Sequence, residues 1–356
     1  MQVWLFIAAG VALMLGLMLR APQSLHPLKA GVFFLVGLGL GAGGIRAVTN
    51  VAGVDRVTDY DAFVAHAAKL TTEDDAPVAL FVGASFSRNA IDDEQLTEEL
   101  RALGYPHRAI NLSLEGASLQ ERQANLIAYL ERSKRTPDVV FFCVAQEFDA
   151  SSAYVFNVAK FSDRAIDQFT PSTAKWAAVG IASGACEGLV GCVKDTGLGA
   201  VHLGLNLMNV GLLSGGENHR TFEAKPSFDP QDEPRQELTD DDINTGLSQL
   251  VEVRPLTGPA WAQAFRAQQR GVLAKKGVRQ VAYYSPPVIS ADQRAYAQSL
   301  CEGELAEFTC IASTNPQLLD GLKGQSWFDD KHLLARGAKV YTRWLADEIH
   351  ERSVLK

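Results

Sequence analysis

The chain has 356 residues, an ordinary apolar fraction of 47% and a formal net charge of −8. No Lys/Arg-rich run is present, which argues against a nucleic-acid partner because phosphate binding needs clustered positive charge. The first fifty residues are far more apolar than the rest, so we expect a short apolar part followed by a large globular part.

Two uncharged apolar runs open the chain, at residues 3–19 and 30–45. Each is near the lower limit of roughly 17–25 residues for a membrane helix. A signal peptide would explain only the first run, which lacks the usual cationic start and small-residue cleavage site. We predict that residues 1–50 form a transmembrane hairpin, with helices at about 3–19 and 30–48. The alternative is a buried helical hairpin in a soluble protein.

The connection between the two runs carries Arg20, His26 and Lys29, whereas no basic side chain precedes the first run. The positive-inside rule places this connection in the cytoplasm. Residues 51–356 then form a periplasmic domain, anchored in the inner (cytoplasmic) membrane of a bacterium.

Strand-like and helical patterns alternate through much of this domain. An amphipathic helix is expected at 55–70. Strands are predicted at 78–82, 107–112, 138–145, 278–286 and 307–312. Helices are predicted at 92–103, 118–132, 259–275, 291–300 and 333–349, and in the last of these Val340, Trp344 and Leu345 can face the core. This alternation predicts an α/β fold, a three-layer, doubly wound parallel sheet with helices on both faces.

The alternation fails within 150–256, which we interpret as a mainly helical insertion over the carboxyl edge of the sheet. Its first part is apolar and rich in Gly and Ala, and an acidic part follows. The apolar part has three interpretations: a cap over a substrate site, a contact with the membrane or a membrane partner, or a satellite helical subdomain.

Four of the five cysteines form two short-range pairs, Cys186 with Cys192 and Cys301 with Cys310. Their spacing is not that of zinc or redox motifs, and no histidine lies nearby. We predict two local disulfides in an oxidising compartment. The alternative is that all five cysteines are small buried hydrophobic residues.

Ser85 is the first candidate for chemistry. It follows the predicted strand 78–82 after Gly83, and side chains at that end of a parallel strand face the edge where active sites form. His332 is the second, just before the last helix, with Asp329 three residues earlier. In a turn, this spacing lets the carboxylate accept from Nδ1–H, so that Nε2 can act as base toward a serine. Taken alone, the pair also fits a helix-terminal Asp and a surface His. His219 is the nearest competitor.

An ester-cleaving site also needs donors for an oxyanion. Gly116 lies in a loop after the second strand, and Gln146 ends the third. We assign the oxyanion site to the backbone N–H groups of Ser85 and Gly116 and the side-chain amide of Gln146. Otherwise Gly116 is a turn residue and Gln146 a solvated strand end.

These features occur in the order that characterises the SGNH/GDSL hydrolase superfamily, which the chain resembles over about residues 78–147 and 278–349. Residues 83–85 (GAS) resemble the first block, Gly116 the second, and Asp329, His332 and Leu333 the last, with Gly337 following. The third block departs, because VAQEFD replaces the usual G-x-N-D. Ala84 also stands where many members have Asp.

The departures and the anchor resemble a subset that includes alginate O-acetyltransferase-like proteins and the D-alanyl transfer protein of teichoic acid modification. The resemblance implies an SGNH-like, flavodoxin-like fold and a serine esterase or acyltransferase. Its triad would be Ser85, His332 and Asp329, and its substrates acyl, chiefly acetyl, esters of a cell-surface or exported polysaccharide or a lipid-linked glycan. It also implies a multi-spanning membrane O-acyltransferase as a partner.

Two non-catalytic hypotheses stay open: a degraded glycan-binding or accessory subunit of such an acyltransferase, or a structural member of a polysaccharide export complex. We expect no metal and no cofactor, because no cluster of His, Cys and Asp has ligand spacing. A phosphate loop is not expected either, since the Gly-rich run GLGLGAGG lies in the second apolar segment.

Overall fold

The computed structural model describes residues 36–37, 39–41, 43–48, 59–73, 75–117, 119–150, 169–182, 186, 188–208, 228–235, 238–324 and 326–355. Five parallel strands form one sheet in the order β2-β1-β3-β4-β5. They are β1 (Val78–Val82), β2 (Arg108–Asn111), β3 (Val139–Cys143), β4 (Gln280–Ser285) and β5 (Thr309–Ala312). Each lies inside a run predicted to be a strand, so the α/β sheet is confirmed.

The central strands explain the sequence pattern. Every residue of β1 and of β3 is buried, as expected for strands that are covered on both faces. Phe81 of β1 stacks on Phe141 of β3 with ring centroids 4.5 Å apart. A continuous apolar run therefore marks these strands where an alternating pattern would mark a half-exposed sheet.

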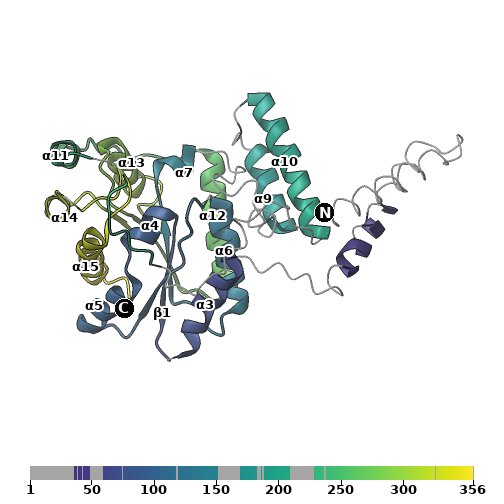
Figure 1. Ribbon diagram of the computed structural model, residues 1–356, viewed down its shortest axis with the longest axis horizontal. Helices are drawn as coiled ribbons and strands as arrows, with labels where there is room; N and C mark the ends of the chain where they lie inside the picture. The colour runs from purple at the N-terminus through teal and green to yellow at the C-terminus, as the bar shows by residue number, and fades with distance from the viewer. Residues whose placement is uncertain are drawn as a thin grey trace, which may run out of the picture.

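Helices cover both faces of the sheet (Figure 1). On one face the core includes side chains of α4 (Ser85–Ala90), α5 (Asp93–Ala102) and α15 (Ala335–Glu351). On the other it includes α3 (Asp59–Glu73) and α6 (Leu119–Arg132). The remaining helices beside the sheet are α11 (Asp240–Ser248), α12 (Ala260–Lys275), α13 (Ala291–Glu302) and α14 (Pro316–Gly321). The chain is thus a three-layer α/β structure.

The closing helix α15 corrects one prediction. Leu345 is fully buried and Trp344 packs partly buried against the core, but Val340 is 39% exposed. At about 100° per residue, Val340 lies about 140° round the helix from Leu345. It therefore points away from the sheet, and the expectation that it faces the core was wrong.

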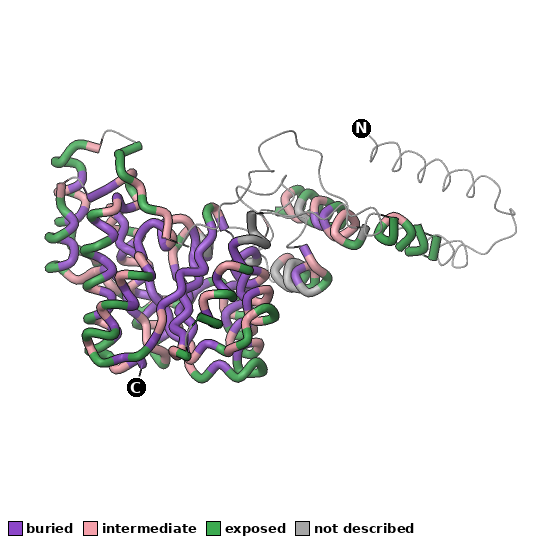
Figure 2. The backbone as a smooth tube through the Cα atoms, turned by 60° about the horizontal axis from the view of Figure 1, so that its bottom comes forward, coloured by how far each residue is buried: buried purple, intermediate pink, exposed green. Residues whose placement is uncertain are grey.

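Four helices are described within the chain segment that breaks the alternation or at its start: α7 (Gln146–Ala150), α9 (Pro171–Ala182), α10 (Gly188–Met208) and α11. Helix α9 contacts α12 and α6, and α10 packs on α9. Figures 1 and 2 show α9 and α10 at the side of the domain, beside the helices of one sheet face.

The predicted membrane hairpin lies largely outside the described residues. The run 3–19 falls wholly outside them, and of 30–48 only residues 36–37, 39–41 and 43–48 are described, as helix. Within the part of the chain that the structure describes, no helix has both the length and the apolar character needed to cross a bilayer.

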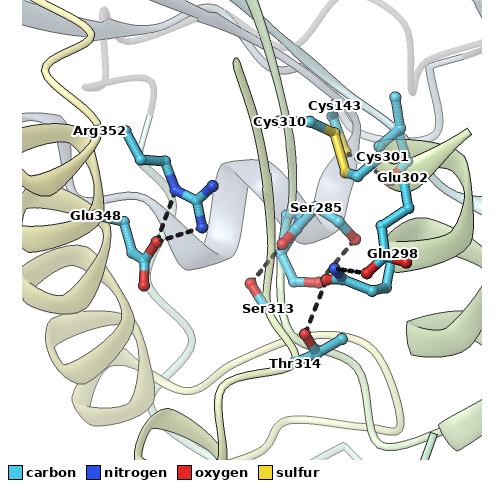
Figure 3. The surroundings of a disulfide bond; sticks show 12 residues. Cys143, Ser285, Gln298, Cys301, Glu302, Cys310, Ser313, Thr314, Glu348 and Arg352 are labelled. Carbon is cyan, nitrogen blue, oxygen red and sulfur yellow. Dashed lines mark hydrogen bonds and ion pairs between the residues drawn. A yellow bond between two sulfur atoms is a disulfide. The ribbon is translucent and has the colours of Figure 1, made fainter. Parts of the chain in front are cut away.

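Both predicted disulfides are present, Cys186–Cys192 and Cys301–Cys310, and Cys143 is free and buried in β3. Figure 3 shows the second disulfide joining α13 to the edge strand β5. Nearby, the Ser313 hydroxyl donates to the carbonyl of Ser285 and so ties the residue after β5 to the last residue of β4. The edge of the sheet is therefore fixed covalently and by hydrogen bonds.

Candidate active site

Ser85 lies at the carboxyl end of β1, where the strand order reverses. The neighbours β2 and β3 continue the chain on opposite sides of β1, and such a reversal is where doubly wound sheets bind ligands. Ser85 is the first residue of α4, and the carbonyl of Ala84 accepts hydrogen bonds from the N–H groups of Ser87 and Arg88. The strand thus turns directly into a helix with the serine at the turn.

Gly83 makes this turn possible by close approach. A Cβ at this position would overlap the Ser87 hydroxyl oxygen and would lie 2.8 Å from the hydroxyl oxygen of Tyr284, which is fully buried. Gly83 is therefore required by the packing beneath Ser85.

A buried amide holds the far end of α4. The Nδ2 group of Asn111 donates to the carbonyls of Ser87 (3.2 Å) and Ile91 (2.9 Å), and its Oδ1 accepts from the N–H of Ser113. Asn111 is completely buried. Because Asn111 ends β2, the second strand positions the helix that carries the serine.

His332 and Asp329 lie in a short loop before α15. The N–H of Phe328 donates to the carbonyl of His332 at 2.8 Å, and an antiparallel bridge joins Trp327 to Leu333. This closure folds residues 329–331 into a tight turn. The backbone N–H groups of Lys331 and of His332 each donate to Asp329 Oδ1 at 2.9 Å, so the carboxylate is fixed inside the turn.

The three predicted side chains meet. His332 Nδ1 lies 2.7 Å from Asp329 Oδ1 and 2.9 Å from Oδ2, and His332 Nε2 lies 2.8 Å from Ser85 Oγ. An ionised carboxylate can only accept, so Nδ1 carries the proton and Nε2 accepts from the serine hydroxyl. This is the hydrogen-bonded order of a Ser–His–Asp triad. The competing residue, His219, lies outside the described residues.

Aromatic rings hold the imidazole from two elements. The ring of Phe86 in α4 lies 6.5 Å from the His332 ring, and that of Phe328 lies 6.3 Å from it, both edge to face. The His332 side chain keeps 20% of its surface exposed. The imidazole is therefore held in place but stays open to a small reactant.

The hydrogen bonds around Asp329 set its charge state. Burial pushes the pKa of this carboxyl upward, but the bonds from the His332 ring and from the two backbone N–H groups outweigh burial, and the pKa lies below its ordinary value. Asp329 is therefore ionised at neutral pH, as it must be to orient and stabilise a charged imidazole.

Two of the predicted oxyanion donors, Gly116 and Gln146, follow the strands on either side of β1. The loop after β2 reaches the nucleophile turn through a hydrogen bond from Leu114 N–H to the carbonyl of Gly83, and Gly116 follows two residues later with a φ of +62°. Gln146 is exposed at the first position of α7, just beyond β3. The strand order thus puts one candidate on each side of Ser85, and their oxyanion role stays a prediction.

An ion pair beside the triad was not foreseen. Lys331 Nζ lies 2.8 Å from Glu147 Oε2, and both side chains are about one-third exposed (30% and 36%). Burial lowers the pKa of Lys331, but the hydrogen bond and charge of Glu147 outweigh burial and raise it above the ordinary value. The pair links the loop that carries His332 to α7.

Buried charges fix α7, which carries Gln146 and Glu147. Both carboxylate oxygens of Asp149 accept from Arg266 Nη1, at 2.8 and 3.0 Å, and the hydroxyl of Tyr296 donates to Asp149 at 2.6 Å. Arg266 also forms two bonds to Glu304. Because Asp149 and Arg266 are both buried, this network ties α7 to α12 and α13.

The acidic part of the insertion runs along the site. Within residues 228–235, Asp229 N–H donates to the carbonyl of Arg88 in α4, and Arg235 N–H donates to that of Phe328. The carbonyl of Gln231 accepts from Ala335, the first residue of α15. We call residues 228–235 the strap. It joins α4 to the loop that carries His332, whereas α9 packs on α12 and α6, and α10 packs on α9.

Comparison of the chain with models of protein families, with curated proteins and with solved structures gives no match. The chemistry of the site therefore has to be inferred from its own geometry. A serine hydroxyl bonded to an imidazole, which is bonded in turn to an ionised carboxylate, can perform nucleophilic attack on an acyl group.

Proposed function

We propose that this chain is a membrane-anchored, periplasm-facing serine esterase or acyltransferase of the SGNH type. The observation that carries the proposal is the continuous contact from Ser85 Oγ through His332 to Asp329, with distances of 2.8 and 2.7 Å. Nucleophile, base and orienting acid are within hydrogen-bond reach before any substrate arrives, which is the geometry that nucleophilic catalysis needs.

In the proposed first half-reaction, Ser85 Oγ attacks an ester carbonyl while its proton passes to His332 Nε2. The carbonyl oxygen becomes an oxyanion that accepts from the N–H groups of Ser85 and Gly116 and from Gln146. The tetrahedral intermediate then loses the alcohol, which takes the proton from His332, and the acyl group stays on Ser85.

In the second half-reaction, an acceptor hydroxyl attacks the acyl-serine and gives its proton to His332. Collapse of the second tetrahedral intermediate returns the proton to Ser85 Oγ.

Water as acceptor makes the chain an esterase, and a sugar hydroxyl makes it an acyltransferase. The two disulfides are consistent with an exported domain. We therefore propose a polysaccharide or lipid-linked glycan as substrate, with a multi-spanning O-acyltransferase as partner.

The test is labelling of the purified full-length chain in detergent with a fluorophosphonate, which reacts with an activated serine. Ser85→Ala should abolish labelling and reduce turnover of a chromogenic acetyl ester by several orders of magnitude. The matched control is Ser248→Ala, an exposed serine at the end of α11, which should leave both unchanged. No labelling of the wild type would favour the non-catalytic alternative, an accessory or glycan-binding subunit.

A further inference from the structure

Helix α10 (Gly188–Met208) has one face that packs and one that does not. On its inner face, Leu198 and Leu203 pack around Phe169, and His202 is 2% exposed with its ring 5.8 Å from that of Phe169. Helix α9 lies on this side. Figure 1 shows α10 as the outer of the two helices, so its other face is turned outward.

The outward face is almost wholly apolar. At about 100° per residue, Leu189, Val190, Val193, Val201 and Leu207 fall within an arc of roughly 120°. Their exposed fractions are 82%, 83%, 66%, 55% and 44%.

Gly197, Ala200 and Gly204 lie between these side chains, and nothing lies within 4 Å of where a Cβ would stand on Gly197 or Gly204. The exposed polar residues Thr196 and Lys194 fall at the two margins of the arc. A contiguous apolar face of this width marks a contact with lipid or with protein.

Both ends of α10 are fixed. The disulfide Cys186–Cys192 fastens its first turns to the preceding chain. At the other end, the Arg46 guanidinium donates to the carbonyls of Asn206 and Leu207, at 3.4 and 3.3 Å. These belong to the last turn, whose carbonyls have no partner within the helix. Arg46 thus caps α10.

Arg46 is also the residue that directly follows the apolar run 30–45. If that run lies in a bilayer, Arg46 marks the lipid boundary, and the end of α10 is within hydrogen-bond distance of it. The distribution of exposed large apolar side chains in the described residues supports this placement. All of them except Leu250 and Val340 lie on residues 36–48 or on α10.

We propose that the outward face of α10 lies in the outer leaflet of the membrane as a second, interfacial contact. The occupant is a phospholipid bilayer, because the apolar face meets the predicted anchor at Arg46, and Lys194 at its margin suits phosphate headgroups. This inference rests on the membrane-anchored part of the proposed function, not on its chemistry.

The test uses the full-length chain in vesicles of phosphatidylethanolamine and phosphatidylglycerol. An environment-sensitive fluorophore is attached to Val201→Cys on α10. The matched control is Leu250→Cys, since Leu250 is 97% exposed, lies next to α11 and is even more accessible than Val201. Leu13→Cys, in the middle of the first apolar run, reports separately on the anchor. The native free thiol, Cys143, is buried and stays unlabelled.

We expect the fluorescence emission of the label at 201 to shift to the blue and to be quenched by nitroxide lipids. Quenching by aqueous iodide should be several-fold weaker at 201 than at 250. Equal iodide quenching at 201 and 250, with 13 protected, would overturn the proposal and leave the anchor intact. Protection at 201 that disappears when protein is diluted in lipid would mean that a second copy covers the face, and would also overturn it. Iodide access at 13 would remove the anchor itself, and Ser85 labelling in the same vesicles would report independently on the chemistry.

Discussion

Replacing Asp329 by Asn should strongly reduce the proposed catalysis, because the proton on the His332 ring would move to the nitrogen that faces Ser85. Oδ1 of Asp329 accepts from the N–H groups of Lys331 and His332, so the amide oxygen of an Asn would keep that place. Its NH₂ would then occupy the Oδ2 position, 2.9 Å from His332 Nδ1. The amide oxygen would still lie 2.7 Å from Nδ1. The neutral amide, however, brings no charge to stabilise an imidazolium, and its NH₂ favours the tautomer with the proton on Nε2, which cannot act as base toward Ser85.

The expected loss is about 10⁴-fold in kcat, the size known for this change in other Ser–His–Asp triads. It corresponds to about 5.5 kcal/mol of transition-state stabilisation. The assays are kcat and KM on a chromogenic acetyl ester and the second-order rate of fluorophosphonate labelling, with Ser85→Ala as the floor. KM should change little, because Asp329 lies behind the imidazole and away from the serine.

Asp330→Asn is the matched control. It makes the same chemical change one residue later in the same loop, at an exposed side chain, and should leave both rates within about twofold of wild type. Labelling of Asp329→Asn at the wild-type rate, with an unchanged melting temperature, would refute the role assigned to the carboxylate.

The same pair of variants has a pH signature. The folded pKa of Asp329 lies below its ordinary value, because hydrogen bonds outweigh burial. Its ionised form therefore stabilises the fold above the unfolded pKa of about 3.9, and this contribution is lost as pH falls through the folded pKa. Asn does not titrate. Melting temperatures should show a wild-type advantage over Asp329→Asn that is constant above about pH 5 and shrinks below about pH 4.

Three further predictions concern the supports of the site. Gly83→Ala should prevent correct folding around the serine, since its Cβ would lie 2.5 Å from Ser87 Cβ; thermal melting and fluorophosphonate labelling should both fall. Arg266→Ala should cost about 3–5 kcal/mol of unfolding free energy, because it leaves two poorly exposed carboxylates without their cation; denaturant titration measures it. The Cys143 thiol should resist alkylation at pH 8 until the chain unfolds, because burial raises its pKa to about 12 despite the positive charge of Arg122; mass spectrometry without reductant should then show one modified thiol.

The parallel sheet could be predicted because its strands are buried on both faces. A run such as residues 78–82 has to be apolar throughout to lie in that position, and no helical periodicity competes with it over five residues. The short helices α4 and α7 had no such signal. They have six and five residues, too few for an amphipathic pattern to repeat.

The triad was predictable because its chemistry restricts residue type. Only a carboxylate and an imidazole at close spacing can orient a base, and the hairpin-like closure at Phe328 turns that spacing into contact. The Lys331–Glu147 pair was not predictable in the same way. Its members are 184 residues apart. An ion pair that is about one-third exposed selects residue types only weakly, since it is worth about 1 kcal/mol or less.

The contacts of the strap could not be predicted from the sequence, because backbone groups make most of them. Its contacts with the site are made mostly by backbone groups: Asp229 to Arg88, Arg235 to Phe328, and Ala335 to Gln231. Every residue except proline offers the same N–H and carbonyl groups, so these bonds leave no mark in the sequence.

The strap links the insertion to the two elements that carry Ser85 and His332. Its hydrogen bonds reach both α4, which begins with Ser85, and the residues that flank His332. Each element also has supports of its own, because Asn111 holds α4 and the closure at Phe328 holds the histidine loop. The strap adds backbone contacts on both sides of the Ser85–His332 hydrogen bond, so the insertion contributes to the surroundings of the site.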